Sequence, residues 1–218
     1  MRHKTPDFID LMREDLSSYA HPEPGLTPYN AYLLPVVERF LGPANGRLFE
    51  IGFGNGAVAA HLASKGFDVA GIEPSQQGLA LARRSYPALT GLQHGTIYED
   101  LRQRFGGFQA VVSLEVIEHL YFPRRLAQAA FALLEPGGVL VISTIYHGYL
   151  KNIATALLGR FDLKMNPLWD HGHIKFFSPR TLTRLLQEAG FENVTVKRPD
   201  LIPQFARSMV VCARKPAP

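Results

Sequence analysis

The chain has 218 residues, of which 46% are hydrophobic and 19% are charged, and its formal net charge is +4 at pH 7. This composition is typical of one soluble α/β domain with a full hydrophobic core. The single cysteine, Cys212, excludes an intramolecular disulfide and a metal site built from several cysteines. Basic residues are scattered along the chain and form no stripe, so nucleic acid is not expected as a partner.

The first 45 residues are predicted to form a helical extension in front of the main domain. Residues 1–20 have a partial apolar face, and the segment 21–25 carries two prolines and a glycine that would end a helix. A second helix is expected to run to Leu41. Acidic residues near the start argue against a signal peptide, and no run is long enough to span a membrane. We therefore expect a cytoplasmic protein.

The stretch around which the rest of the chain is organised begins with an apolar run over 48–51 and ends at Glu73. The run is followed by three alternate glycines: Gly52, Gly54 and Gly56. A helical segment and a second apolar run then lead to Glu73, which predicts a strand–turn–helix–strand unit. Glycines at such a turn let a ligand approach the backbone, and the next helix N-terminus attracts an anion. Because an acid at Glu73 can accept hydrogen bonds from ribose hydroxyls, the unit predicts a site for a nucleoside with a negatively charged group.

The remainder of the chain alternates strands with helices almost to its end. Strands are expected over 92–97, 108–114, 139–144, 193–196 and 208–214, and helices over 75–86, 99–104, 123–134 and 178–189. The last two strands adjoin through a loop, which predicts a mostly parallel sheet that finishes in a hairpin. The expected fold class is α/β, with a Rossmann-like seven-stranded sheet, an antiparallel last strand and helices on both faces.

An acid two residues before the first glycine separates two cofactor classes. The dinucleotide fingerprint G-x-G-x-x-G/A is met only in its loose form, by Gly52, Gly54 and Ala57. The fuller pattern Glu50-x-Gly52-x-Gly54-x-Gly56 resembles motif I of the class I methyltransferases that depend on S-adenosylmethionine (SAM). An NAD-dependent oxidoreductase is the alternative.

Two later segments are similar to the same methyltransferase family. They are the turn Glu135-Pro136-Gly137-Gly138 and the run Leu-Leu-Gln-Glu-Ala-Gly-Phe over 185–191. Neither segment is expected in a dehydrogenase. The resemblance extends from about Arg47 to Lys215 and covers most of the chain.

The resemblance implies SAM as the cofactor and S-adenosylhomocysteine (SAH) as the product. In this family the glycine loop and its preceding acid hold the methionine part of SAM, the acid at Glu73 holds the ribose, and strand ends flank the adenine. The cofactor-binding residues that it implies are Glu50, Gly52, Gly54, Gly56, Glu73, Pro74, Ile97, Tyr98, Leu114 and Glu115. It divides a single domain over 1–218 into a lid over 1–45, a SAM-binding half over 46–144, an acceptor-site insertion over 145–177 and the last helix and strands over 178–218.

The segment after the fourth predicted strand carries the candidates for catalysis. It lacks the Asn/Asp-Pro-Pro-Tyr/Phe run of enzymes that methylate the exocyclic amines of bases, which favours an oxygen acceptor in a small molecule. The run Glu115-x-x-Glu118-His119 resembles that of the quinone-biosynthesis O-methyltransferases and also that of the small-RNA 2′-O-methyltransferases. In both groups these residues can hold a divalent metal, and His173 is placed to join them. The predicted catalytic residues are His119, Glu115 and His173.

Two mechanisms for removal of the acceptor proton stay open at this point. His119 can act as a lone general base, with His147 or His173 as its substitute. A metal on Glu115, Glu118, His119 and His173 would lower the pKa of the acceptor instead. Glu118 and His119 would have no chemical role if they only cap the next helix. We favour the metal-free base over a divalent metal.

The insertion over 145–177 is expected to shape the acceptor site. Its apolar residues Leu150, Ile153, Leu157, Leu158, Phe161 and Met165 fall on one helical face. Since basic residues flank this face, we expect it to border an apolar acceptor or to make peripheral contact with a membrane. The alternative is a helix that only covers the core. An RNA 2′-O-methyltransferase with a metal site, and a SAM-binding protein without activity, are the other functions considered.

Overall fold

The computed structural model of the chain describes residues 23–164, 168 and 172–217. In this part of the chain one seven-stranded sheet has the strand order β3-β2-β1-β4-β5-β7-β6. The strands are β1 (Arg47–Ile51), β2 (Asp68–Glu73), β3 (Leu92–His94), β4 (Phe108–Leu114), β5 (Leu134–Ile145), β6 (Glu192–Lys197) and β7 (Ser208–Arg214). Neighbours from β3 to β5 are parallel, whereas β7 is antiparallel to β5 and to β6. The predicted fold class is confirmed.

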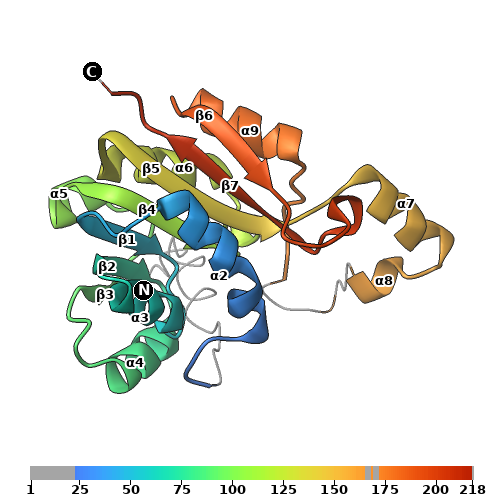
Figure 1. Cartoon of the computed structure of the whole chain (residues 1–218). Coiled ribbons are helices and arrows are strands. Elements are labelled where there is room, and N and C mark those ends of the chain that lie inside the picture. The colour runs from blue at the N-terminus through green and yellow to red at the C-terminus, as the bar shows by residue number, and fades with distance from the viewer. Residues whose placement is uncertain (1–22, 165–167, 169–171, 218) are drawn as a thin grey trace, which may run out of the picture.

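Helices cover both faces of this sheet (Figure 1). They are α2 (Pro28–Leu41), α3 (Ala57–Ser64), α4 (Gln76–Ser85), α5 (Leu101–Phe105), α6 (Pro123–Leu133), α7 (Tyr149–Leu157), α8 (Phe161–Lys164) and α9 (Pro179–Glu188), with the 3₁₀ turns η1 (Ile117–His119) and η2 (Pro203–Phe205). Helices α2, α3 and α4 pack on one face, and α5, α6 and α9 pack on the other. The helix expected within residues 1–20 lies outside the described residues.

The core follows from the alternation of side chains along buried strands. On β4, Val111 joins the cluster under α5, α6 and α9, whereas its neighbours Ala110 and Val112 join the cluster under α2, α3 and α4. Both faces are apolar because a parallel strand with helices on each side is buried twice. The apolar run over 108–114 therefore becomes a central strand, as expected.

Two reciprocal hydrogen bonds between Thr27 and Asn30 cap the start of helix α2, and both residues line the cavity described below. The Thr27 hydroxyl accepts from the Asn30 N–H at 3.0 Å, and the Asn30 side chain accepts from the Thr27 N–H at 3.2 Å. Such a capping box satisfies N–H groups that a helix start leaves unpaired. Leu33 and Val37 then bury the inner face of α2 against the sheet.

Two strand boundaries differ from the prediction by more than one residue. Strand β3 ends at His94 rather than at residue 97, because its pairing partner β2 ends opposite it at Glu73. Strand β5 begins at Leu134, so the predicted turn Glu135-Pro136-Gly137-Gly138 lies within it. The pairing of β4 with β5 shifts register between Phe108 and Ala110. Residues 135–138 of β5 are therefore not paired with β4 and form a bulge.

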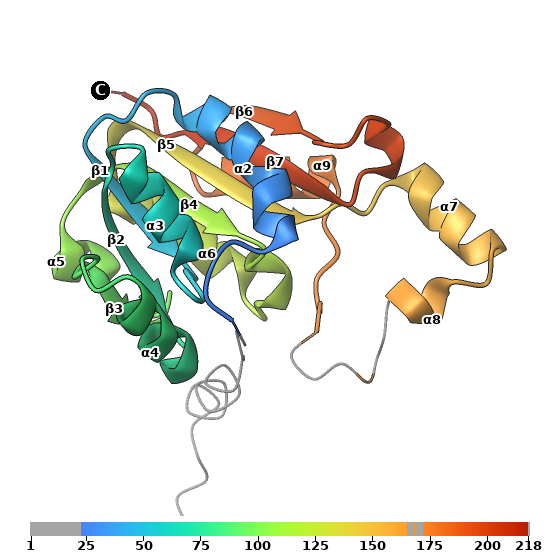
Figure 2. The same cartoon turned by 60° about the horizontal axis from the view of Figure 1, so that its bottom comes forward.

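The insertion after β5 forms two helices instead of the one helical face expected from Leu150 to Met165. The chain breaks between α7 and α8 at Gly159, which has a φ of 62° that favours glycine. Figures 1 and 2 both show α7 and α8 projecting beyond the sheet, so α7 does not cover the main core. None of the described helices is long and apolar enough to cross a membrane.

Candidate functional site

A cavity of about 320 Å³ opens at the carboxyl ends of β1, β2 and β4, beside the first turn of α2. Open α/β sheets bind their ligands at this edge, where loops can enclose a molecule without disturbing the core. The predicted cofactor residues that line the cavity are Glu50, Gly52, Gly54, Glu73, Pro74, Ile97, Tyr98, Leu114 and Glu115. Gly56 is the predicted cofactor residue that does not line it.

The three glycines all have positive φ but meet different surroundings. A Cβ on Gly52 would lie 2.6 Å from Val116 Cγ2, so only glycine fits between the loop after β1 and the loop after β4. A Cβ on Gly56 would lie 2.8 Å from the Cβ of Ala82 in α4. Gly56 thus allows the start of α3 to pack closely on α4.

Glu73, at the end of β2, orders the glycine loop. Its carboxylate accepts hydrogen bonds from the Gly54 N–H at 2.8 Å and from the Ser75 N–H at 2.9 Å. Burial raises the pKa of Glu73, and these two bonds act in the opposite direction. Each carboxylate oxygen has a second lone pair, so Glu73 can still accept hydrogen bonds from two ligand hydroxyls.

Glu50, on β1, is a buried acid with unmet hydrogen-bonding capacity. It is 2% exposed, and its Oε2 has no hydrogen-bond partner among the described residues. Burial, with a smaller contribution from Glu73, raises the pKa of Glu50 to about 8. Because an isolated charge is costly to bury, a cationic group on a ligand would favour the ionised form and satisfy this oxygen.

Asn55 connects the glycine loop to the segment that precedes α2. Its side-chain amide donates to the carbonyl oxygens of Glu23 and Gly25, both at 2.9 Å, and its Oδ1 accepts from the Ala57 N–H at 3.0 Å. One side chain therefore fixes the loop, the start of α3 and the approach to α2. Asn55 also lines the cavity.

Apolar side chains and one phenol form the wall beyond Glu73. Ile97 and Leu114 are buried, and the Tyr98 hydroxyl has no hydrogen-bond partner among the described residues. Burial raises the pKa of Tyr98. Apolar walls with a few polar groups are suited to a flat heteroaromatic ring.

Glu115 lies at the other end of the cavity and has an unusual backbone conformation. Its φ is 55°, a region that residues other than glycine rarely adopt. Its side chain accepts from the Ser143 hydroxyl at 2.6 Å and from the Ser208 hydroxyl at 3.3 Å. The backbone of Glu115 is thus held in a strained form with its carboxylate at the cavity wall.

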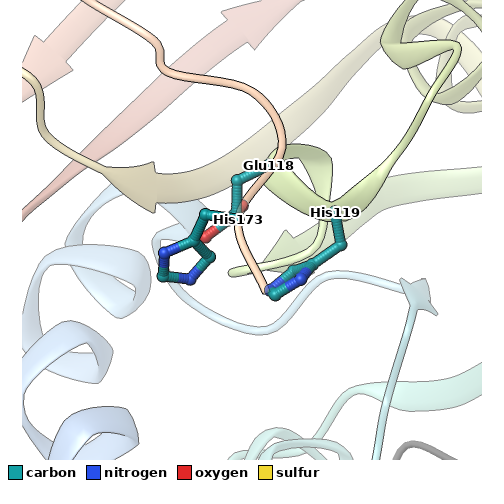
Figure 3. Close-up of side chains that lie close together, drawn as sticks. All are labelled: Glu118, His119 and His173. Carbon is teal, nitrogen blue, oxygen red and sulfur yellow. The ribbon is translucent and has the colours of Figure 1, made fainter. Parts of the chain in front are cut away.

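Three of the residues predicted to bind a metal do meet in space. Glu118 and His119 come from η1 and His173 comes from the segment before α9, and Figure 3 shows their side chains converging. One ligand atom from each lies within 4.8 Å of the others. The main-chain oxygen of Glu118 accepts from the Ile174 and Lys175 N–H groups at 2.9 and 3.0 Å, which brings His173 to η1. Glu115 binds the two serines instead and is not in this group.

Electrostatics distinguish the members of this cluster. Glu118 is fully buried, and burial together with the Glu115 carboxylate raises its pKa well above the usual range. Its Oε2 accepts from the Thr144 hydroxyl at 3.0 Å. Burial, followed by the neighbouring His119 and His147, lowers the pKa of His173 to about 4. Burial thus favours the uncharged form of Glu118, and His173 is uncharged at neutral pH.

The other histidines predicted near the site have different outcomes. His119 lines the cavity, and its ring centroid lies 4.9 Å from that of His173. The His147 ring packs against the edge of Phe176, with centroids 4.8 Å apart. His171 lies outside the described residues.

A family model described as a methyltransferase domain matches residues 28–196. The chain belongs to the class I SAM-dependent methyltransferases. The enzyme uses SAM as its methyl donor, and the NAD-dependent oxidoreductase considered above is excluded.

Three curated relatives of the methyltransferase are named ubiquinone biosynthesis O-methyltransferase. The protein from Aromatoleum aromaticum is 30% identical over 166 residues, which are 75% of this chain and 71% of the relative. The protein from Dinoroseobacter shibae is 34% identical over 69% of this chain and 62% of its own length. The protein from Burkholderia pseudomallei is 28% identical over 89% of this chain and 85% of its own length. The matched region thus spans from just under two thirds to most of the length of these relatives.

Solved structures share the fold of the methyltransferase. A SAM-dependent methyltransferase from Mesorhizobium loti has a TM-score of 0.66 at 21% identity and covers 86% of this chain and 99% of its own. A phosphoethanolamine N-methyltransferase from Haemonchus contortus, in complex with SAM, has a TM-score of 0.64 at 16% identity and covers 94% and 56% of the two chains. At these identities the likeness concerns the fold alone.

The structure adds residues to the site that the sequence prediction lacks. They are Asn55 at the cavity wall, and Ser143, Thr144 and Ser208 behind the two acids. Hydroxyl residues inside the otherwise apolar strands β5 and β7 are the signal that could have revealed the last three, because buried polar side chains need partners.

Proposed function

We propose that the enzyme methylates a hydroxyl oxygen of a small aromatic molecule with an apolar substituent. The observation that carries this proposal is that Glu115 and His119, both from the segment after β4, line the wall of the cavity. The names of the curated relatives, which refer to O-methylation in ubiquinone biosynthesis, support an oxygen acceptor of this class.

The proposed reaction is an in-line displacement at the methyl carbon of SAM. The acceptor oxygen forms a bond to the methyl carbon, the carbon–sulfur bond breaks, and the sulfonium becomes the neutral thioether of SAH. The protein has to align the three atoms, which an enclosed cavity favours. The hydroxyl proton has to leave, and His119 is the group that we assign to accept it.

A divalent cation is the alternative means of activating the acceptor. Glu118, His119 and His173 fit one, because they offer a carboxylate and two imidazoles within 4.8 Å and Glu118 Oε1 accepts no hydrogen bond from a described residue. Bound there, a cation would lower the pKa of an acceptor hydroxyl. We propose the metal-free base, because His119 is the member of this trio that lines the cavity, whereas Glu118 is fully buried and its burial raises its pKa.

The experiment is a methyl-transfer assay with SAM and a series of alkyl-substituted catechols, with mass spectrometry of the products. A singly methylated catechol is expected, and EDTA should leave its rate unchanged. His119→Ala should lose roughly 10²–10⁴ in rate, the usual contribution of a general base, while SAH binding persists. Loss of activity in EDTA with recovery in Mg²⁺ or Mn²⁺ would establish the metal version. Methylation of amines or of RNA, and of no catechol, would contradict the proposal.

The N-terminal segment is proposed to serve as a lid over the cofactor. Thr27 and Tyr29 line the cavity, and Asn55 fixes the backbone at Glu23 and Gly25. The segment over 23–30 is therefore in a position to enclose a bound ligand. The assignment of 145–177 as the acceptor-site insertion is a proposal of the same kind.

We also propose that the insertion rests on an anionic lipid surface. Large apolar side chains on α7, on α8 and in the loop between β6 and β7 are exposed: Tyr149 86%, Leu150 55%, Leu157 82%, Leu158 66%, Phe161 49%, Leu201 99%, Ile202 57% and Phe205 51%. The buried Lys151 amine donates to the carbonyl oxygens of Tyr146 and Ala206 at 2.8 and 2.9 Å, and it thereby joins α7 to the β6–β7 loop. Basic residues of the same loop, such as Arg198 and Arg207, suit negatively charged headgroups.

A further inference from the structure

Two serine hydroxyls from neighbouring strands hold the Glu115 carboxylate. Ser143 lies on β5 and Ser208 begins β7, and both residues are fully buried. The Ser143 hydroxyl donates to Oε1 of Glu115 at 2.6 Å, and the Ser208 hydroxyl donates to Oε2 at 3.3 Å. Because β5 and β7 are paired along seven residues each, these two donors belong to the rigid part of the fold.

The third member of this network comes from a different element. Tyr29, in the first turn of α2, forms a hydrogen bond between its hydroxyl and the Ser208 hydroxyl. A serine hydroxyl has one proton, and Ser208 gives it to Glu115. Tyr29 must therefore donate to Ser208, so the hydrogen bonds run in one direction, from Tyr29 through Ser208 to Glu115.

A chain of hydrogen bonds in one direction strengthens each of its members. The hydroxyl of Ser208 becomes a better donor when its oxygen accepts from Tyr29. The 3.3 Å bond from Ser208 to Glu115 is the longer of the two that hold the carboxylate, so it has the most to gain from this strengthening. Tyr29 itself lines the cavity together with Glu115, so it reaches the acid from the ligand side.

We propose that Tyr29 is a positioning residue for methyl transfer, which holds the Glu115 carboxylate at the acceptor end of the cavity through Ser208. This inference rests on the proposed function, since it assigns Glu115 to the acceptor side of the site. Asn55 fixes the segment before α2 by its bonds to Glu23 and Gly25, and it thereby positions Tyr29 in the first turn of α2. The acceptor end is complete only when the start of α2 is docked on the glycine loop.

The test is a double-mutant cycle with Tyr29→Phe and Ser208→Ala in the catechol assay. Each single variant should lower kcat by roughly five- to tenfold, the effect of one lost hydrogen bond, with little change in the KM for SAM. The double variant should fall no further than the stronger single variant, because both changes break one chain. Tyr32→Phe is the matched control. Tyr32 lies on the same helix as Tyr29, its hydroxyl bonds Asp200 in the β6–β7 loop, and it does not line the cavity, so kcat should be unchanged.

A second readout requires no acceptor. Tyr29→Phe, but not Tyr32→Phe, should accelerate amide hydrogen exchange over residues 114–120 in the SAH complex. Wild-type enzyme that methylates no catechol would refute the proposed function, and the exchange result would then still decide whether Tyr29 positions Glu115. Unchanged exchange with unchanged kcat, or single effects that multiply in the double variant, would overturn the inference. A change confined to the KM of the acceptor would also overturn it, by making Tyr29 a substrate contact.

Discussion

Glu50 and Glu73 are two buried acids on neighbouring strands, and no lysine or arginine is among the described residues that line the cavity. This arrangement discriminates between nucleoside cofactors. The diphosphate of NAD would bring negative charge toward two carboxyl groups. SAM brings a sulfonium and an ammonium group, which stabilise ionised carboxylates. We propose that Glu50, an acid that the dinucleotide fingerprint does not require, makes this βαβ unit favour SAM over a dinucleotide.

Stability of the free enzyme should depend on pH through Glu50. The folded-state pKa of about 8 lies above the ordinary value of 4.5, so between these limits the folded state binds more protons and stability falls as pH rises. Glu50→Gln removes this penalty and should stabilise the free enzyme by roughly 2–4 kcal/mol near pH 8, with a much smaller gain near pH 5. Thermal unfolding of both proteins at the two pH values is the measurement. An equal gain at both would show that Glu50 does not titrate in this way.

The same substitution should weaken SAH binding, because an amide cannot pair with the ammonium group of the cofactor. Calorimetric titration on the stabilised variant separates the two effects. A variant that is both more stable and binds SAH as tightly as wild type would remove Glu50 from the cofactor site.

Among the elements, the turn between β1 and α3 has to make room for a ligand and has to let α3 pack closely on α4, and different glycines serve these two purposes. Gly54 lines the cavity, whereas Gly56 lies against Ala82 in α4 and does not. Gly56→Ala should therefore destabilise the fold by roughly 1–3 kcal/mol through overpacking, yet leave SAH affinity nearly unchanged once folded. Gly54→Ala should weaken SAH binding. Calorimetry with parallel melting curves tests the pair, and a reversed pattern would show that Gly56 touches the cofactor.

The helices of the insertion are the elements on which the membrane proposal depends. Leu157 is 82% exposed on α7, so Leu157→Asp should leave the fold intact. It should reduce sedimentation with anionic phospholipid vesicles, because an exposed apolar side chain that would enter the lipid surface is replaced by a charge that the headgroups repel. Gln77→Glu adds one negative charge on α4, far from α7, and serves as the control. Equal sedimentation of Leu157→Asp and wild type would remove α7 from the lipid contact.

At the scale of the whole molecule, the sheet was predictable from the sequence because its strands are marked by two-sided apolar runs. The strand over 108–114 and the strand over 208–214 have the predicted limits. The break at Gly159 was missed, since the apolar residues around it keep a helical spacing that conceals the positive φ. The bulge in β5 was read as a turn because Pro136 and the glycines after it are common in turns.

The candidate site was predictable only in part, for a related reason. Residues next to one another in motifs, such as Glu50 and the glycines or Glu118 and His119, could be named from the sequence. The network of Tyr29, Ser208 and Glu115 joins positions up to 179 residues apart, and it depends on the antiparallel insertion of β7 beside β5. Pairing partners of that separation leave no local pattern. The structure was needed to find them.

We propose that the cavity binds SAM with Glu73 on the ribose. Calorimetric titration of SAH and of NAD into wild-type enzyme and Glu73→Ala tests it most directly, with melting curves to confirm that the variant is folded. We predict that SAH binds wild type, that NAD gives no heat, and that Glu73→Ala loses roughly 1–3 kcal/mol of SAH binding, the scale for hydrogen bonds to a charged group. Wild-type affinity for SAH in folded Glu73→Ala, or binding of NAD in place of SAH, would contradict the account.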